Sequence, residues 1–230
     1  MVKSKSSMTG QSSGKASISG AKSFDDIWYY MESKYNVLFE DSTKKLPLES
    51  LKVAASGIEA VIQGNPRAEE GISKVTYVPG GGGSLAANDG EGGIILRGVF
   101  SDPDRLKLSA KFGGDPREIT AHEAGHSIER VLLLDNTSSW PSYVRGWNSH
   151  KQATSVISEA ARMVQKTPDG IRADGRKKTF DQMVGEVSAY ALKSRSEALA
   201  ECVADYAVNG SSADPLSVAV HEVLKRRLGN

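Results

Sequence analysis

The segment His122-Glu123-Ala124-Gly125-His126 constrains this chain more than any other, because it places two of the four histidines one helical turn apart. Residues i and i+4 of an α-helix lie about 40° apart around the axis and about 6 Å apart along it. Both imidazoles can therefore reach one ion from a single helix face. Zinc accepts neutral imidazole nitrogen, and Glu123 would lie beside a water on that zinc as a general base. The pattern predicts a helix with His122 and His126 as zinc ligands.

The sequence around this segment supports a helix that packs closely against another element. Asp115 and Pro116 are typical of an N-cap followed by proline at the first helical position, and the helix is predicted to run to about Leu134. A glycine in the middle of a helix, here Gly125, costs about 1 kcal/mol relative to alanine. A surface helix with two histidines is the alternative, but it gives no reason for this glycine.

A catalytic zinc site uses three protein ligands and a water, so a third ligand is needed. The remaining histidines are poor candidates. His150 lies at a junction between a loop and a helix, where a cap or a surface position is expected. His221 lies in the C-terminal helix, where it is expected to pack or to face solvent. The third histidine of a metzincin motif is also missing after His126.

The segment Ser194–Ala207 offers carboxylates in place of a histidine. Glu197, Glu201 and Asp205 are spaced at i, i+4 and i+8, so they share one helix face. Such neighbours repel each other by a few tenths of a kcal/mol per pair in a free helix, and a cation would reverse that effect. Ser194 and Glu197 also fit a capping box, which explains the first acid but not the other two. The spacing therefore predicts a metal-facing helix.

These motifs resemble those of the gluzincin metallopeptidases of the anthrax lethal factor type. They also resemble the zincin-like domains of phage minor head proteins and toxin-like proteins. The resemblance spans about Ile94–Val208, and three short motifs carry nearly all of it. It implies that Glu197 is the third zinc ligand and that Glu201 orients a ligand histidine. It also implies that Tyr190, seven residues before Glu197, assists at the oxyanion.

A thermolysin-like assignment would instead make Glu201 the ligand and Asp205 its orienting partner. That pattern carries asparagine immediately before the ligand glutamate, whereas Ala200 stands here. Ser194 occupies the position seven residues before Glu201, where a tyrosine would be needed. The chain also departs from the lethal factor pattern, because asparagine is common at the position of Ser194 and because the stretch between the two motifs is longer.

The resemblance implies an α+β, zincin-like fold in which a small mixed sheet packs on the HExxH helix and on the glutamate helix. Strands are predicted at Lys74–Val78 and Ile94–Phe100, with the glycine-rich segment Pro79–Gly93 as a loop between them. The second strand is expected at the edge of the sheet, where an extended peptide could pair with it. Helices are predicted to begin at Ser23 or Asp25 and near Ser194 and Pro215, and to span residues 47–64 and 149–166. A loop is predicted that contains Trp140, Tyr143 and Trp147.

Composition limits the remaining possibilities. Residues 1–22 are rich in serine, glycine and lysine and are predicted to be a disordered arm or linker before a single domain at 23–230. The single cysteine, Cys202, excludes an internal disulfide. A net charge of +1 gives no reason to expect binding to nucleic acid or to an anionic membrane. No signal peptide or membrane span is evident, so a cytoplasmic or virion-associated location is expected.

The expected function is that of a zinc-dependent metalloendopeptidase, with Zn²⁺ as cofactor and an extended polypeptide as substrate. Two alternatives remain open on the sequence. The first is a phage head (minor capsid) protein or another virion component with a structural or vestigial zinc site. The second is a metal-dependent hydrolase of a compound other than a peptide.

Overall fold

The structure of the protein is a computed structural model that describes residues 17–80, 84–109 and 115–229. Within these ranges the chain forms a mostly helical α+β structure with one small mixed sheet. The α-helices are α1 (Phe24–Tyr35), α2 (Leu48–Gly64), α3 (Pro103–Leu108), α4 (Glu118–Asp135), α5 (Trp140–Ser149), α6 (Lys151–Val164), α7 (Phe180–Val187), α8 (Arg195–Asn209) and α9 (Pro215–Leu228). The strands are β1 (Leu38–Phe39), β2 (Lys74–Tyr77), β3 (Ala86–Asn88) and β4 (Gly93–Leu96).

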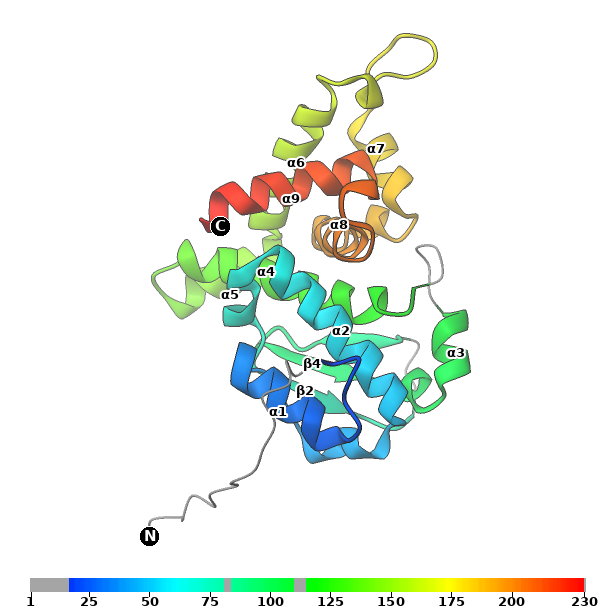
Figure 1. Cartoon of the computed structure of the whole chain (residues 1–230). Coiled ribbons are helices and arrows are strands. Elements are labelled where there is room, and N and C mark those ends of the chain that lie inside the picture. The colour runs from blue at the N-terminus through cyan, green and yellow to red at the C-terminus, as the bar shows by residue number, and fades with distance from the viewer. Residues whose placement is uncertain (1–16, 81–83, 110–114, 230) are drawn as a thin grey trace.

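The sheet has the strand order β1-β2-β4-β3. β1 is parallel to β2 and β2 is parallel to β4, whereas β3 pairs antiparallel with β4 and forms one edge of the sheet. Figure 1 shows the sheet together with α1, α2 and α3 in one part of the molecule, and α6, α7, α8 and α9 in the other. The two parts meet where α4 packs against α8, which is the most extensive contact between elements in the described chain.

Gly125 makes the close contact between α4 and α8 possible. A Cβ atom at this position would lie 2.8 Å from the Cα and 3.3 Å from the Cβ of Ala200 on α8. Both distances are below normal van der Waals contact, so a larger side chain would push the two helices apart. The glycine of the HExxH segment therefore sets the distance between the helix with the histidines and the helix with the glutamates.

The strand predicted at Ile94–Phe100 is wrong in its length and in its place. β4 ends at Leu96, and it lies between β2 and β3 rather than at an edge. The edge strand next to β4 is β3, which lies inside the glycine-rich segment Pro79–Gly93, where a loop is predicted. The Asp89-Gly90 pair makes the turn to β4, where Asp89 Oδ1 accepts two backbone N–H groups at 2.8 and 2.7 Å. An Asp-Gly pair is typical of a hairpin turn, but the glycines around it are equally typical of a loop, so the hairpin is not predicted.

The predicted loop around Trp140 is the helix α5. Trp140, Tyr143 and Trp147 are spaced at i, i+3 and i+7, which is the period of one helix face, and Pro141 lies in the first turn. The rings of Tyr143 and Trp147 stack with centroids 6.4 Å apart. Tyr143 Oη donates to the carbonyl oxygen of Gly90 at 3.1 Å, so α5 is tied to the β3–β4 hairpin.

Most of the other predicted helices are confirmed. α1 follows Ser23 in a capping box, α8 follows the N-cap Ser194, and α9 begins at Pro215. α4 begins at Glu118, slightly later than the predicted first helical residue Pro116, because a turn precedes it. The short helix α7 was not predicted.

The predicted N-terminal arm, residues 1–22, lies mainly outside the described residues. Its described part, residues 17–22, packs on the protein, because Ile18 and Ala21 are buried among the core side chains. The packed chain therefore starts earlier than the predicted boundary at residue 23. Among the described helices, none has both the length and the apolar character that crossing a membrane requires.

Candidate metal centre

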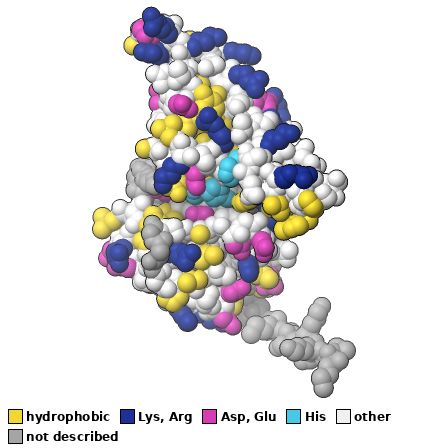
Figure 2. Space-filling model, turned by 180° about the vertical axis from the view of Figure 1, so that it is seen from behind, with side chains coloured by type: hydrophobic (Ala, Val, Ile, Leu, Met, Phe, Trp, Pro, Cys, Tyr) yellow, Lys and Arg dark blue, Asp and Glu magenta, His cyan; other side chains and the backbone are white. Residues whose placement is uncertain are grey.

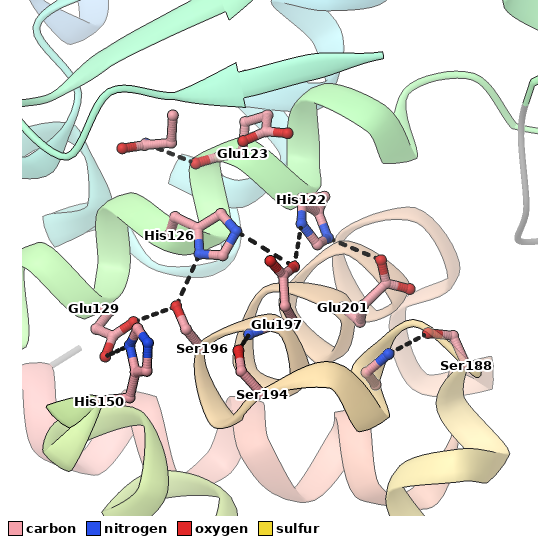
Figure 3. Close-up of polar contacts among 12 residues, drawn as sticks. His122, Glu123, His126, Glu129, His150, Ser188, Ser194, Ser196, Glu197 and Glu201 are labelled. Carbon is pink, nitrogen blue, oxygen red and sulfur yellow. Dashed lines mark hydrogen bonds and ion pairs between the residues drawn. The ribbon is translucent and has the colours of Figure 1, made fainter. Parts of the chain in front are cut away.

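The side chains of His122 and His126 on α4 point toward the Glu197 carboxylate on α8, as Figure 3 shows. Glu197 Oε2 lies 3.0 Å from His122 Nε2 and 3.6 Å from His126 Nε2. One ligand atom from each residue lies within 4.8 Å of the others, so the three residues could hold a metal ion. The fold thus brings together the three residues that the motif and the resemblance assign as ligands.

Glu197 reaches the histidines from the first turn of its helix. Ser194 Oγ caps α8 by accepting the backbone N–H of Glu197 at 3.1 Å. A complete capping box would return the Glu197 carboxylate to the cap, but this carboxylate faces the two histidines instead. Its Oε2 atom is buried and makes no hydrogen bond of good geometry with the described residues. A cation at this position would satisfy the buried oxygen.

The Nδ1 atoms of both histidines face polar side chains on the side away from Glu197. His122 Nδ1 lies 2.9 Å from Oε1 of Glu201, whose side chain is only 2% exposed. His126 Nδ1 lies 3.1 Å from Ser196 Oγ. Contacts of this kind fix the ring orientation of metal-ligating histidines and leave the other ring nitrogen for the metal.

Glu123 lies on the same helix between the two histidines. It is buried, with 9% of its surface exposed, and this burial raises the pKa of its carboxyl above the usual range. Its backbone oxygen accepts a hydrogen bond of 3.0 Å from Asn88 Nδ2, and the same amide group lies 2.9 Å from Ser127 Oγ. Asn88 is the last residue of β3, so these contacts tie the edge strand to the helix that carries the candidate base.

Tyr190 packs edge-on against His122, with ring centroids 5.7 Å apart. Lys193 Nζ lies 3.8 Å from the centre of the Tyr190 ring. Burial, followed by the charges of Glu197 and other nearby carboxylates, raises the pKa of the Tyr190 hydroxyl. A tyrosine hydroxyl is protonated at neutral pH even without this shift, so it can act as a hydrogen-bond donor.

The contacts between histidines and carboxylates define the charge of the metal-free centre. Burial disfavours the charged imidazole of His122, but contacts with Glu197 and Glu201 outweigh burial and raise the pKa of His122 to about 9. Burial likewise opposes ionisation of Glu197, but His122 and His126 hold the pKa of this carboxyl well below its usual range. At neutral pH the His122 imidazole of the metal-free centre is therefore positively charged, with a proton on each ring nitrogen. A metal would have to displace the proton on the nitrogen that it binds.

The other candidates from the sequence lie elsewhere. Asp205 is buried and accepts hydrogen bonds from Asn209 Nδ2 at 2.8 Å and from the backbone N–H of Asp214 at 2.9 Å, so it stabilises the connection from α8 to α9. His221 stacks on Tyr206 with ring centroids 3.8 Å apart. The expectation that three acids face the metal is therefore wrong for Asp205.

Three residues near the centre were not singled out by the sequence. They are Asn88, Ser196 and Glu129, and His150 joins them through a contact of 3.4 Å with Glu129 Oε1. Glu129 lies seven residues after His122 and three after His126, so helical spacing alone places it on the same side of α4. That spacing was the available signal.

Figure 2 shows histidine side chains at the surface in the middle of one face of the molecule. Hydrophobic side chains gather beside them over α5, where Trp140 and Val144 are exposed.

Comparison of the chain with models of protein families, with curated proteins and with solved structures gives no match.

Proposed function

We propose that the protein is a zinc-dependent metallopeptidase of the gluzincin type. The observation that carries this proposal is the convergence of His122 Nε2, His126 Nε2 and Glu197 Oε2, with Glu123 beside the first ligand on the same helix. Two imidazoles and one carboxylate form a donor set that catalytic zinc uses in hydrolases. The placement of this set between α4 and α8, next to a short mixed sheet, supports a zincin-like fold.

The donor set fits zinc better than calcium or magnesium. Calcium and magnesium prefer oxygen ligands, whereas two of the three donors here are imidazole nitrogens. The buried Oε2 of Glu197 lies between the two imidazoles, so a cation bound there would replace the positive charge of the His122 imidazolium. When bound, zinc supplies positive charge that makes a water more acidic and polarises a carbonyl group.

Glu123 is the general base of the proposed reaction. Its carboxylate accepts a proton from the attacking water, the water oxygen bonds to the carbonyl carbon of the peptide, and the C–N bond breaks. Glu123 then passes the proton to the leaving nitrogen, so the products are a carboxylic acid and an amine. Burial raises the pKa of Glu123 and so makes its carboxylate a better proton acceptor than an exposed one.

Tyr190 is the proposed donor to the developing oxyanion. Its hydroxyl is protonated at neutral pH, as that of any tyrosine is, and its ring contacts the ligand His122. A protonated hydroxyl at this position can donate a hydrogen bond to the carbonyl oxygen as negative charge builds up on it.

The substrate is proposed to be an extended polypeptide that pairs with β3. This strand is bonded on one side to β4, and no other described strand pairs with its outer side. Asn88 at its end is bonded to the backbone oxygen of Glu123, so a peptide along β3 would lie near the helix that carries the candidate base. An edge strand binds an extended peptide through backbone hydrogen bonds, and this requires no particular side chains.

The test is cleavage of a broad peptide library by the zinc-loaded protein and by two variants. Glu123→Gln removes the proton acceptor at nearly constant shape, so cleavage should fall at least about 100-fold while zinc content stays unchanged. Glu222→Gln, an exposed position on α9, is the matched control and should cleave like wild type. A wild-type protein that binds zinc but cleaves no peptide would contradict the proposal and favour a structural zinc site, as in a virion component.

A further inference from the structure

A buried carboxylate lies behind the second histidine of the centre. Glu129 on α4 is 0% exposed, and its Oε2 accepts a hydrogen bond of 2.5 Å from Ser196 Oγ on α8. Ser196, itself only 6% exposed, lies 3.1 Å from His126 Nδ1. The three side chains therefore form a continuous chain of contacts from the protein interior to His126 (Figure 3).

The direction of the hydrogen bonds in this chain follows from the donors that each group has. A carboxylate only accepts, so the single hydroxyl proton of Ser196 is donated to Glu129. The Ser196 oxygen can then only accept from His126, which requires the proton of the neutral imidazole to be on Nδ1. The Nε2 atom of His126 is left with its lone pair, and it faces Glu197.

The first histidine also has a carboxylate on its Nδ1 side, with no serine between them. The carboxylate of Glu201 contacts His122 Nδ1 directly at 2.9 Å. Each histidine thus has a buried carboxylate on its Nδ1 side. Glu201 contacts His122 directly, and Glu129 is connected to His126 through the Ser196 hydroxyl. The resemblance implies a role for Glu201 but says nothing of Glu129.

We propose that Glu129, acting through Ser196, is a positioning residue that holds His126 in the tautomer with Nε2 free for the metal. This inference rests on the proposed metal centre. Glu129 belongs to α4, the same helix as His126, but it acts through a hydroxyl on α8, so it also fixes the register between the two helices. His150, at the junction of α5 and α6, places Nδ1 3.4 Å from Glu129 Oε1 and gives the buried carboxylate a second polar neighbour.

A purely structural role for Glu129 is the competing explanation. A buried carboxylate with few partners is unfavourable for folding, so an apolar residue would serve packing better. Oε1 of Glu129 makes no hydrogen bond of good geometry with the described residues, so the carboxylate is not fully satisfied by its own contacts. An incompletely satisfied buried group fits a residue kept for its effect on His126.

The experiment measures zinc affinity by competition with a chelator for wild type, Ser196→Ala, Ser196→Thr and Glu129→Gln. The amide group that Glu129→Gln introduces can donate to the serine oxygen, which would turn the hydroxyl proton toward His126 and favour the wrong tautomer. Ser196→Ala and Glu129→Gln should weaken zinc binding about 10–100-fold, as loss of such supporting contacts does. Ser196→Thr keeps the hydroxyl and should restore most of the affinity.

Ser50→Ala is the matched control, because Ser50 is fully buried on α2 and its hydroxyl has no hydrogen-bond partner among the described residues. It should bind zinc like wild type. Nitrogen NMR of the zinc-loaded wild type gives a second readout that does not depend on any variant: His126 should show a protonated Nδ1 and a metal-bound Nε2.

Wild-type affinity in folded Ser196→Ala and Glu129→Gln would overturn the inference while the metal centre stands. Metal coordination through Nδ1 of His126 would overturn it as well. A wild-type protein that binds no zinc would instead overturn the proposed function, and the inference with it.

Discussion

At the scale of single residues, the centre gives different roles to two glutamates on one helix. Glu197 faces both Nε2 atoms, whereas Glu201 lies against Nδ1 of His122. Loss of a ligand should nearly empty the site, and loss of an orienting partner should weaken binding only about 10–100-fold. In chelator competition, Glu197→Ala should therefore bind zinc far more weakly than Glu201→Ala. The opposite order would show that the ligand lies one helical turn further along α8.

The charge of the metal-free centre leads to a prediction about protons. The pKa of His122 is about 9, so its imidazole is protonated at pH 7, whereas zinc binds the neutral form. Zinc binding at pH 7 should release about one proton from His122, and apparent affinity should fall about tenfold for each pH unit below this pKa. Calorimetry in two buffers with different ionisation enthalpies measures this release. Equal heats in the two buffers would contradict the proposed charge state.

Part of the centre could be predicted from residues alone. His122, Glu123 and His126 follow from a fixed spacing on one helix, which local sequence determines. Glu197 is separated from them by a long insert, so its assignment needed the resemblance to known motifs. Ser196 and Glu129 meet only because two helices cross, and no spacing along the chain describes that contact.

At the scale of elements, the distance between α4 and α8 decides whether the centre can form. Gly125→Ala adds a Cβ within 2.8 Å of Ala200 Cα, so overpacking should destabilise the protein by about 1–3 kcal/mol, against a gain in helix propensity of about 1 kcal/mol. It should also weaken zinc binding, because Glu197 moves with α8. Urea denaturation and chelator competition measure the two effects.

Gly185→Ala is the control for this substitution. Gly185 also lies inside a helix, α7, but the nearest described atom to a Cβ there would be Leu192 Cδ1 at 3.5 Å, which is an ordinary contact. Gly185→Ala should therefore leave zinc affinity unchanged and should not destabilise the protein. If both variants behaved alike, the close approach at Gly125 would have no part in building the centre.

The elements differed in how well the sequence predicted them. Helices with strong caps, such as α1 and α8, follow from local signals at Ser23 and Ser194. β3 has only three residues, and its pairing with β4 is a contact that the glycines around it obscured. A loop is predicted at α5, but Trp140, Tyr143 and Trp147 have helical spacing and the segment is a helix.

At the scale of the whole molecule, the centre lies where the sheet-containing part meets the C-terminal helices (Figure 1). The histidines come from α4 and the glutamate from α8, so a metal would link the two parts. A ligand that binds only the folded state stabilises it by about 2.7 kcal/mol at a free concentration 100 times its dissociation constant. Zinc should therefore raise the melting temperature of the wild type, and it should raise that of Glu197→Ala much less. Equal shifts in both proteins would place zinc elsewhere.

The most direct test of the proposed metal centre is the zinc content of purified protein after reconstitution and removal of free metal, for wild type, His126→Ala and His221→Ala. His221 packs on Tyr206, away from the candidate ligands, and controls for the loss of a histidine as such. Wild type and His221→Ala should each hold close to one zinc per chain, and His126→Ala should hold almost none, because one of the three ligands is gone. A folded wild-type protein without zinc, or a His126→Ala variant with as much zinc as wild type, would contradict the proposed centre.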